Sequence, residues 1–219
     1  MIADPRAVAE RWPEPRQRAI AELATAVALA PWTARRPREL SDDEILHVVA
    51  LSAFFGHLNR IADAVAAPLD YEVRHLPPQA EPSTPMLLAA PARVPGEPAI
   101  ALARRPATAD ALASWRSYVF ERDEPLTRRQ RAVIAAHVAE SLGDRDHEDD
   151  GLEPRGDLEG GLVELAVVVT RAPWWLVDEP HKSWDGLGLS DAALFDAVAT
   201  ASTAGVASRI TVALTAIGQ

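Results

Sequence analysis

The feature that most constrains the fold is a long helical segment that the chain carries twice. The first copy, LSDDEILHVVALSAFFGHLNRIADAVAA, covers residues 40–67, and the second covers residues 189–218. Ser41 and Glu44 have the spacing of a capping box, which predicts a helix start. Residues 48–56 carry no charge, and a helix that is apolar all round is buried all round. We therefore expect the first copy to run through the middle of the core.

An offset of 149 residues aligns the two copies. It pairs identical residues of one copy with those of the other: Ser41 with Ser190, Asp42 with Asp191, Gly56 with Gly205, Arg60 with Arg209, and Ile61 with Ile210. Upstream, the runs Glu-Leu-Ala and Ala-Pro-Trp, which begin at Glu22 and Ala30, recur at an offset of 142 residues. We interpret this as an internal duplication, in which the two units pack about a pseudo-two-fold axis and cover each other's apolar faces.

The chain is predicted to be a single all-α domain over residues 1–219. Hydrophobic residues make up 48% of it, enough for a sizeable core. Repeat one covers about 18–67, the middle helices about 107–142, and repeat two about 161–218. Thr127 is the expected N-cap of the second middle helix. Prolines are frequent in residues 68–98, which predicts a long connection between the halves.

Composition excludes several classes of function. The chain has no cysteine, which rules out disulfides, thiolate nucleophiles, iron–sulfur clusters and cysteine-ligated zinc. A formal net charge of −10 repels nucleic acid and anionic membranes, so neither is an expected partner. No uninterrupted apolar run is long enough to span a bilayer, and the N-terminus is too polar for a secretory signal. We expect a cytoplasmic protein that has no cofactor.

The first copy resembles the central helix of the alkylhydroperoxidase D-like, or carboxymuconolactone decarboxylase-like, superfamily, in particular its peroxidase-related and CMD domain members. The shared elements are an aromatic pair, Asn-Arg, and Ala-Asp, which here are residues 54–55, 59–60 and 62–63. The stretch from Trp115 to Asp144 resembles the second landmark of that family. The resemblance implies an all-α fold with two pseudo-repeats, which assembles into a homo-oligomer, a dimer or higher.

The chain departs from the family at the redox centre. In the family a Cys-x-x-Cys pair follows the helix that here ends near Leu142, whereas this chain has Asp-Arg-Asp-His at residues 144–147. A carboxylate cannot attack a peroxide as a thiolate does. Two functions remain open. One is a binding or structural homologue without peroxidase activity, and the other is a cysteine-independent enzyme of the decarboxylase type that acts on a small anionic substrate.

The matched arginines Arg60 and Arg209 allow two interpretations. Each repeat supplies a glutamate at a matched position, Glu22 and Glu164, and a carboxylate partner is the usual way to bury an arginine. The alternative is that Arg60 faces a cavity and holds an anionic substrate through two hydrogen bonds.

In that alternative, Asn59 and Asp63 line the same cavity as substrate-binding residues. His57 is then the first choice for a general base, oriented by Asp63 or Glu22, and His137 is the second choice. A lone helical histidine is otherwise a satisfied core or surface residue.

No metal site is expected. The chain has no His-Glu-x-x-His pattern and no three-histidine pattern. Residues 144–160 are strongly acidic, and this composition is typical of an exposed loop.

Overall fold

The structure, a computed structural model, describes residues 12–67, 106–144, 152–173, 175–178 and 186–218. All regular secondary structure in this part of the chain is helical, which confirms the predicted all-α class. The elements in chain order are α2 (Pro15–Leu29), η1 (Pro31–Thr33), α3 (Asp42–Ala64), α5 (Pro106–Phe120), α6 (Arg128–Ser141), α7 (Gly156–Arg171), α8 (Trp175–Asp178) and α10 (Asp191–Ile217). The proline-rich connection 68–98 lies outside the described residues.

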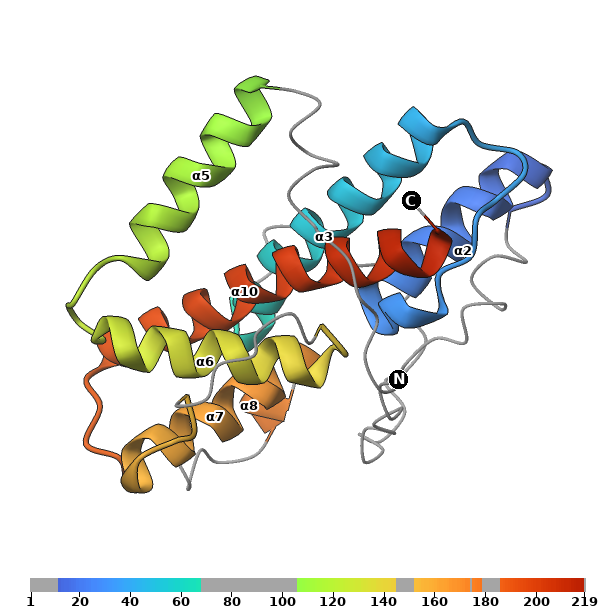
Figure 1. Cartoon of the computed structure of the whole chain (residues 1–219). Helices are drawn as coiled ribbons and strands as arrows, with labels where there is room; N and C mark the ends of the chain where they lie inside the picture. The colour runs from blue at the N-terminus through green and yellow to red at the C-terminus, as the bar shows by residue number, and fades with distance from the viewer. Residues whose placement is uncertain (1–11, 68–105, 145–151, 174, 179–185, 219) are drawn as a thin grey trace.

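The central helix of the fold is α10. It packs against α2, α3, α5, α6 and α7 (Figure 1). Two clusters of buried side chains meet along it. One joins residues 193–204 of α10 to α6 and α7, and the other joins residues 206–217 to α2 and α3. Small residues such as Ala201 and Ala204 fill much of α10, which lets neighbouring helices pack closely on every side.

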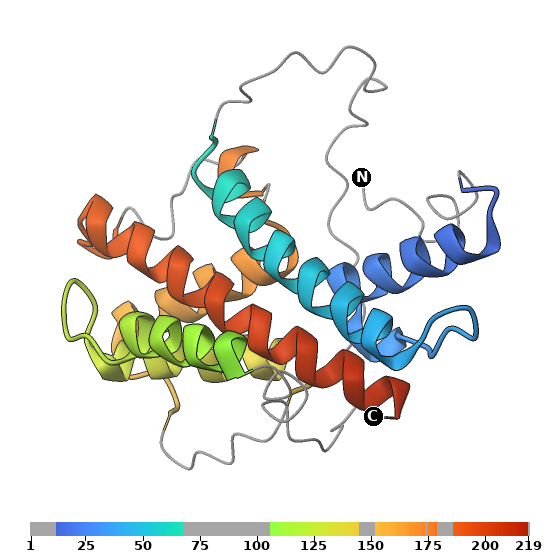
Figure 2. The same ribbon diagram turned by 90° about the horizontal axis from the view of Figure 1, so that it is seen from above.

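The prediction that the first copy is buried all round is wrong. The buried side chains of α3 are Ile45, Val49, Ala53 and His57, which recur every four residues and therefore form one face. The opposite face is exposed although it is apolar. Figure 2 shows α3 beside α10, running obliquely in the opposite direction. The charge-free stretch therefore identified an apolar helix correctly but placed the wrong copy at the centre.

Two predicted helix starts are confirmed by their caps. The Ser41 hydroxyl accepts from the Glu44 amide and the Glu44 carboxylate accepts from the Ser41 amide at 2.8 Å, which makes a complete capping box. Thr127, the predicted start of the middle helix α6, forms a second box with Gln130. Both boxes satisfy main-chain donors that a helix leaves free in its first turn.

The predicted acidic loop 144–160 is too long at its C-terminal end. Helix α7 begins at Gly156, so Asp157 and Glu159 belong to its first turn, where negative charge is stabilised by the helix dipole. Glu159 is buried and accepts from the Arg155 amide at 2.8 Å. Residues 145–151 lie outside the described part, and so does most of the position that the redox pair occupies in the family.

Two described helices, α3 and α10, are long and apolar enough to cross a membrane by length and composition alone. In α10, 89% of the apolar window is buried inside the fold, whereas the share in α3 is 22%. The buried core helix of a soluble fold meets the same criteria, so these two helices are only weak evidence for a membrane span.

Candidate functional site

Arg60 lies on the buried side of α3, and three of its nitrogen atoms donate to main-chain carbonyl oxygens. Nε donates to Thr170 at 3.2 Å, Nη1 to Gly56 at 2.7 Å, and Nη2 to Ala28 at 2.9 Å. Ala28 and Thr170 belong to the last turns of α2 and α7, where carbonyl groups have no partner within the helix. The guanidinium of Arg60 therefore connects the C-terminal ends of two helices.

Arg209 on α10 makes the corresponding set of bonds from the opposite side. Its Nη1 donates to Gly205 at 3.3 Å, four residues earlier, as Arg60 donates to Gly56. Its Nη2 donates to Thr170 at 2.8 Å and its Nε to Ala28 at 3.4 Å. The two arginines thus share both helix-end carbonyls, and the Nε and Nη2 atoms exchange roles between them. We call this group of four residues, Arg60, Arg209, Ala28 and Thr170, the arginine pair site.

The glycine four residues before each arginine makes room for the guanidinium. A Cβ atom on Gly56 would lie 2.6 Å from Nη1 of Arg60, and one on Gly205 would lie 2.7 Å from Nη1 of Arg209. Both distances are far below a normal van der Waals contact. Each glycine therefore admits the side chain one turn further along its own helix. The repeated Gly-x3-Arg spacing is therefore a single structural unit.

The predicted pairing of these arginines with glutamate is replaced by pairing with carbonyl oxygens. Glu22 and Glu164 are exposed, and within the described ranges no ion pair joins either of them to Arg60 or Arg209. The negative ends of the α2 and α7 dipoles provide the compensation instead. A helix C-terminus can accept a cation without bringing a second full charge into the core.

Burial and mutual repulsion both act on the two guanidinium groups. Desolvation lowers the pKa of Arg60 to about 10, opposed by the charge of Asp63, so Arg60 remains protonated at neutral pH. Desolvation also lowers the pKa of Arg209, and the positive charges of Arg60 and Arg171 lower it further. The carbonyl bonds must therefore offset both a desolvation cost and a repulsion between like charges.

His57 packs against aromatic side chains of α3 and α5. Its ring meets Trp115 of α5 edge-on at a centroid distance of 5.0 Å and Phe54 at 6.3 Å. Its carbonyl oxygen accepts from the Ser202 hydroxyl at 3.0 Å. The ring is buried, and Nδ1 has no hydrogen-bond partner among the described residues. Desolvation lowers the pKa of His57, an effect that Arg60 reinforces and Ser202 opposes.

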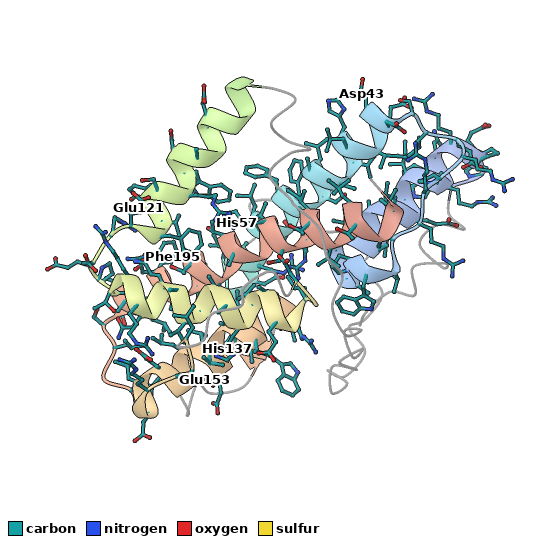
Figure 3. All side chains as sticks on the ribbon, in the orientation of Figure 1. Asp43, His57, Glu121, His137, Glu153 and Phe195 are labelled. Carbon is teal, nitrogen blue, oxygen red and sulfur yellow. The ribbon has the colours of Figure 1, made fainter. Side chains whose placement is uncertain are left out.

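The remaining predicted site residues are not gathered around His57. Asn59 and Asp63 are exposed; burial raises the pKa of the Asp63 carboxyl, and Arg60 opposes that shift. The orientation of His57 by Asp63 or Glu22 is not seen, since Nδ1 has no such partner in the described ranges. His137 lies on α6, with Nδ1 at 3.4 Å from a Glu140 carboxylate oxygen. Figure 3 shows it on the opposite side of α10 from His57.

A second buried polar centre escaped the sequence analysis. Arg131 of α6 is fully buried, and its Nη1 donates to a carboxylate oxygen of Asp196 at 3.0 Å. Nη2 of Arg131 forms an ion pair with the other oxygen of Asp196. Arg131 also donates to the carbonyl group of Val119 in the last turn of α5. It donates as well to three carbonyl groups of the segment that joins α5 to α6, those of Arg122, Glu124 and Leu126. This centre fixes the α5–α6 turn onto α10.

A sequence signal for this centre exists. Arg131 occurs three and seven residues before Ile134 and Val138, so it lies on the apolar face of its helix. Asp196 is likewise an acid within a long apolar helix. A charge on an apolar face predicts a buried partner of opposite charge.

The described residues contain no group of three or more His, Asp or Glu side chains that could hold a metal ion. A comparison with known proteins found no matching family model, no matching curated protein and no matching solved structure.

Proposed function

We propose that this chain is a cysteine-less relative of the alkylhydroperoxidase D-like proteins, built from two pseudo-repeats, that acts by binding and not by thiol peroxidase chemistry. The absence of cysteine removes the nucleophile that such chemistry requires. The positive charge that an anion clamp would use is engaged inside the fold, because Arg60 donates to three carbonyl oxygens.

The duplication is supported by the geometry of the arginine pair site. Arg60 and Arg209 are 149 residues apart, and so are Gly56 and Gly205. Ala28 and Thr170 are 142 residues apart, the offset that also relates Glu22 to Glu164. Exchanging each residue for its counterpart converts the hydrogen bonds of Arg60 into those of Arg209. Such an exchange is expected of two units related by a pseudo-two-fold axis.

One observation carries the binding role: α3 presents a continuous apolar face to solvent, centred on Phe54 and Phe55. An exposed apolar patch of this kind is typical of an interaction surface. Of the remaining candidate residues, His57 is buried against aromatic rings, whereas Asn59 and Asp63 are exposed.

A turnover assay tests this proposal. The purified protein, given an organic hydroperoxide and a non-thiol electron donor such as ascorbate, should consume the hydroperoxide no faster than the His57→Gln variant or buffer alone. Reduction at enzyme-like rates by the unmodified chain, lost in His57→Gln, would overturn the binding role.

The second candidate function is a cysteine-independent enzyme with His57 as general base. The observation in its favour is the buried Nδ1 of His57, which lacks a partner in the described ranges, with the charge of Arg60 one turn away. A lowered pKa keeps this imidazole neutral and able to accept a proton near neutral pH. Under this alternative, His57→Gln abolishes turnover of a small carboxylate substrate while the melting temperature changes little.

A further inference from the structure

Four large apolar side chains form a stripe along the outer face of α3. Their exposed fractions are 54% for Leu51, 44% for Phe54, 57% for Phe55 and 44% for Leu58. We call these four residues the α3 stripe. Their spacing of three, four and seven residues is that of a helix seam which packs against another helix. Monomeric proteins rarely expose a contiguous apolar surface of more than a few hundred Å² unless it binds something.

The corresponding face of α10 shows what covers such a stripe. The positions 149 residues later are Thr200, Thr203, Ala204 and Ala207. The first three are buried, and α6 packs along this part of α10, where Ile134 and Val138 join Ala201 and Ala204 in one cluster. Among the described helices, the first half of the chain supplies α2 and α3 but no counterpart of α6. The face that α6 covers on α10 is therefore open on α3.

The order of residues in the α3 stripe is palindromic. Read in either direction along the helix, it is Leu, two intervening residues, Phe, Phe, two intervening residues, Leu. A two-fold axis through the middle of the stripe therefore places Leu51 of one copy opposite Leu58 of the other. The same axis places Phe54 of one copy opposite Phe55 of the other. A self-complementary surface of this kind is what an isologous dimer requires, since each contact then occurs twice.

We infer that the α3 stripe binds the α3 stripe of a second copy of this chain, with the two helices antiparallel. This rests on the proposed function, because it names the partner of the binding surface. The second α3 takes the place on α3 that α6 takes on α10. The acidic side chains of α3 lie only towards the ends of the helix, at Asp42, Asp43, Glu44 and Asp63. The core of the interface is therefore apolar and its rim polar, as in stable dimers.

Mass measurement over a range of protein concentrations gives the first test. The full chain should have twice the mass of one chain. Phe55→Glu should weaken the dimer roughly 100-fold or more, because the interface loses two buried aromatic side chains and buries two carboxylates, each opposite Phe54 of the other copy. Phe195→Glu is the matched control, since Phe195 is 51% exposed but lies on α10. It should leave the dimer unchanged. Helical circular dichroism checks that both variants fold.

Cross-linking tests whether the two α3 helices are antiparallel. Because the chain has no cysteine, only the introduced cysteines can form a disulfide. Copies carrying Leu51→Cys, mixed with copies carrying Leu58→Cys, should form a disulfide between the two kinds of chain under mild oxidation. Leu51→Cys alone should not, since an antiparallel pair separates the two residues 51 by roughly 10 Å along the axis. That spacing exceeds the distance of about 7 Å that a disulfide can bridge. Self-cross-linking of Leu51→Cys would indicate parallel helices and would overturn the inference.

Two further outcomes also overturn it. One is a monomer at every concentration. The other is a monomer that sediments with neutral phosphatidylcholine vesicles and loses this binding in Phe55→Glu, which would make the α3 stripe a lipid-binding face. If the protein is a monomer and shows no turnover, the dimer inference fails but the proposed binding role does not. If turnover depends on His57, the proposed binding role fails, whatever the oligomeric state.

Discussion

Arg60 and Arg209 donate to the same two carbonyl oxygens, those of Ala28 and Thr170. Two like charges therefore lie in one buried site, and among the described residues neither forms an ion pair with a carboxylate. What compensates them is the pair of helix C-termini that meet there. This explains why the chain repeats an arginine at this place without repeating a buried acid. It also explains how α2, α3, α7 and α10 are held at one point.

The glycines of the Gly-x3-Arg unit should resist replacement by alanine. By helix propensity alone, Gly→Ala inside a helix stabilises by about 1 kcal/mol. At Gly56 and Gly205 the new methyl group would overlap a guanidinium that three carbonyl bonds hold in place. We predict a net loss of about 1–3 kcal/mol in the free energy of unfolding for each variant, measured by urea denaturation.

Gly160 in α7 is the matched control for these two variants. A Cβ atom there meets nothing within 4 Å. Gly160→Ala should therefore show the propensity effect alone and raise the free energy of unfolding. A stabilised Gly56→Ala would show that the space above that glycine is not needed by Arg60.

Arg131 is predicted to be the costliest single charge to remove. Arg131→Met leaves Asp196 buried with only the contact at 3.2 Å from Arg122, and an uncompensated buried charge costs about 3–5 kcal/mol. Arg131→Met combined with Asp196→Leu should be more stable than Arg131→Met alone, because the unpaired carboxylate is gone. Chemical denaturation of both variants measures this. A double variant less stable than Arg131→Met would contradict the assignment.

His57 should make stability depend on pH. Burial lowers the pKa of His57 in the folded protein, whereas the pKa of a histidine in the unfolded chain is about 6.5. Between these two values the unfolded chain binds more protons, so the free energy of unfolding rises with pH. The contribution is fully present above about pH 6.5, and it is lost as the pH falls through the folded pKa.

The difference in unfolding free energy between the native chain and His57→Phe, measured across this pH range, isolates the effect. A pH profile that is identical in the native chain and His57→Phe would show that the ring is solvated in the folded state.

The capping box at Ser41 should contribute measurably to α3. Ser41→Ala removes the acceptor for the Glu44 amide, and the loss of such a cap costs about 1 kcal/mol. Ser41→Asn keeps a side-chain oxygen in the same place and should be close to the native chain in thermal unfolding. Equal melting temperatures for Ser41→Ala and the native chain would show that the box does not stabilise the helix.

Local rules predicted the helices well. Caps, prolines and apolar spacing gave the starts of α3 and α6 at Ser41 and Thr127, because these signals act within one or two turns of the chain. The burial of α3 could not be predicted in the same way. Its apolar stretch resembles that of α10, and the difference between them arises from α6, which packs along α10 but makes no comparable packing against α3 among the described helices. Which of two similar helices is covered by a third helix depends on the tertiary packing and not on the local sequence.

The sequence predicted the two arginines of the candidate site, but not the groups that accept their hydrogen bonds. The spacing of Arg60 and Arg209 identified two buried charges, and a search for opposite charge then suggested Glu22 and Glu164. Carbonyl groups at helix ends leave no trace in residue identity, because every residue has one. Ala28 and Thr170 could therefore be identified as acceptors only once α2 and α7 had been placed.

A double-mutant cycle on Arg60→Met and Arg209→Met tests whether the two arginines share their carbonyl acceptors, with the free energy of unfolding as the readout. Each single variant leaves one arginine on both helix-end carbonyls, whereas the double variant leaves neither carbonyl with a donor. We therefore predict that the double variant loses more stability than the two single variants together, by about 1 kcal/mol or more. Additive losses, or an Arg60→Met variant as stable as the native chain, would contradict the shared-acceptor account and favour an Arg60 that is reserved for a ligand.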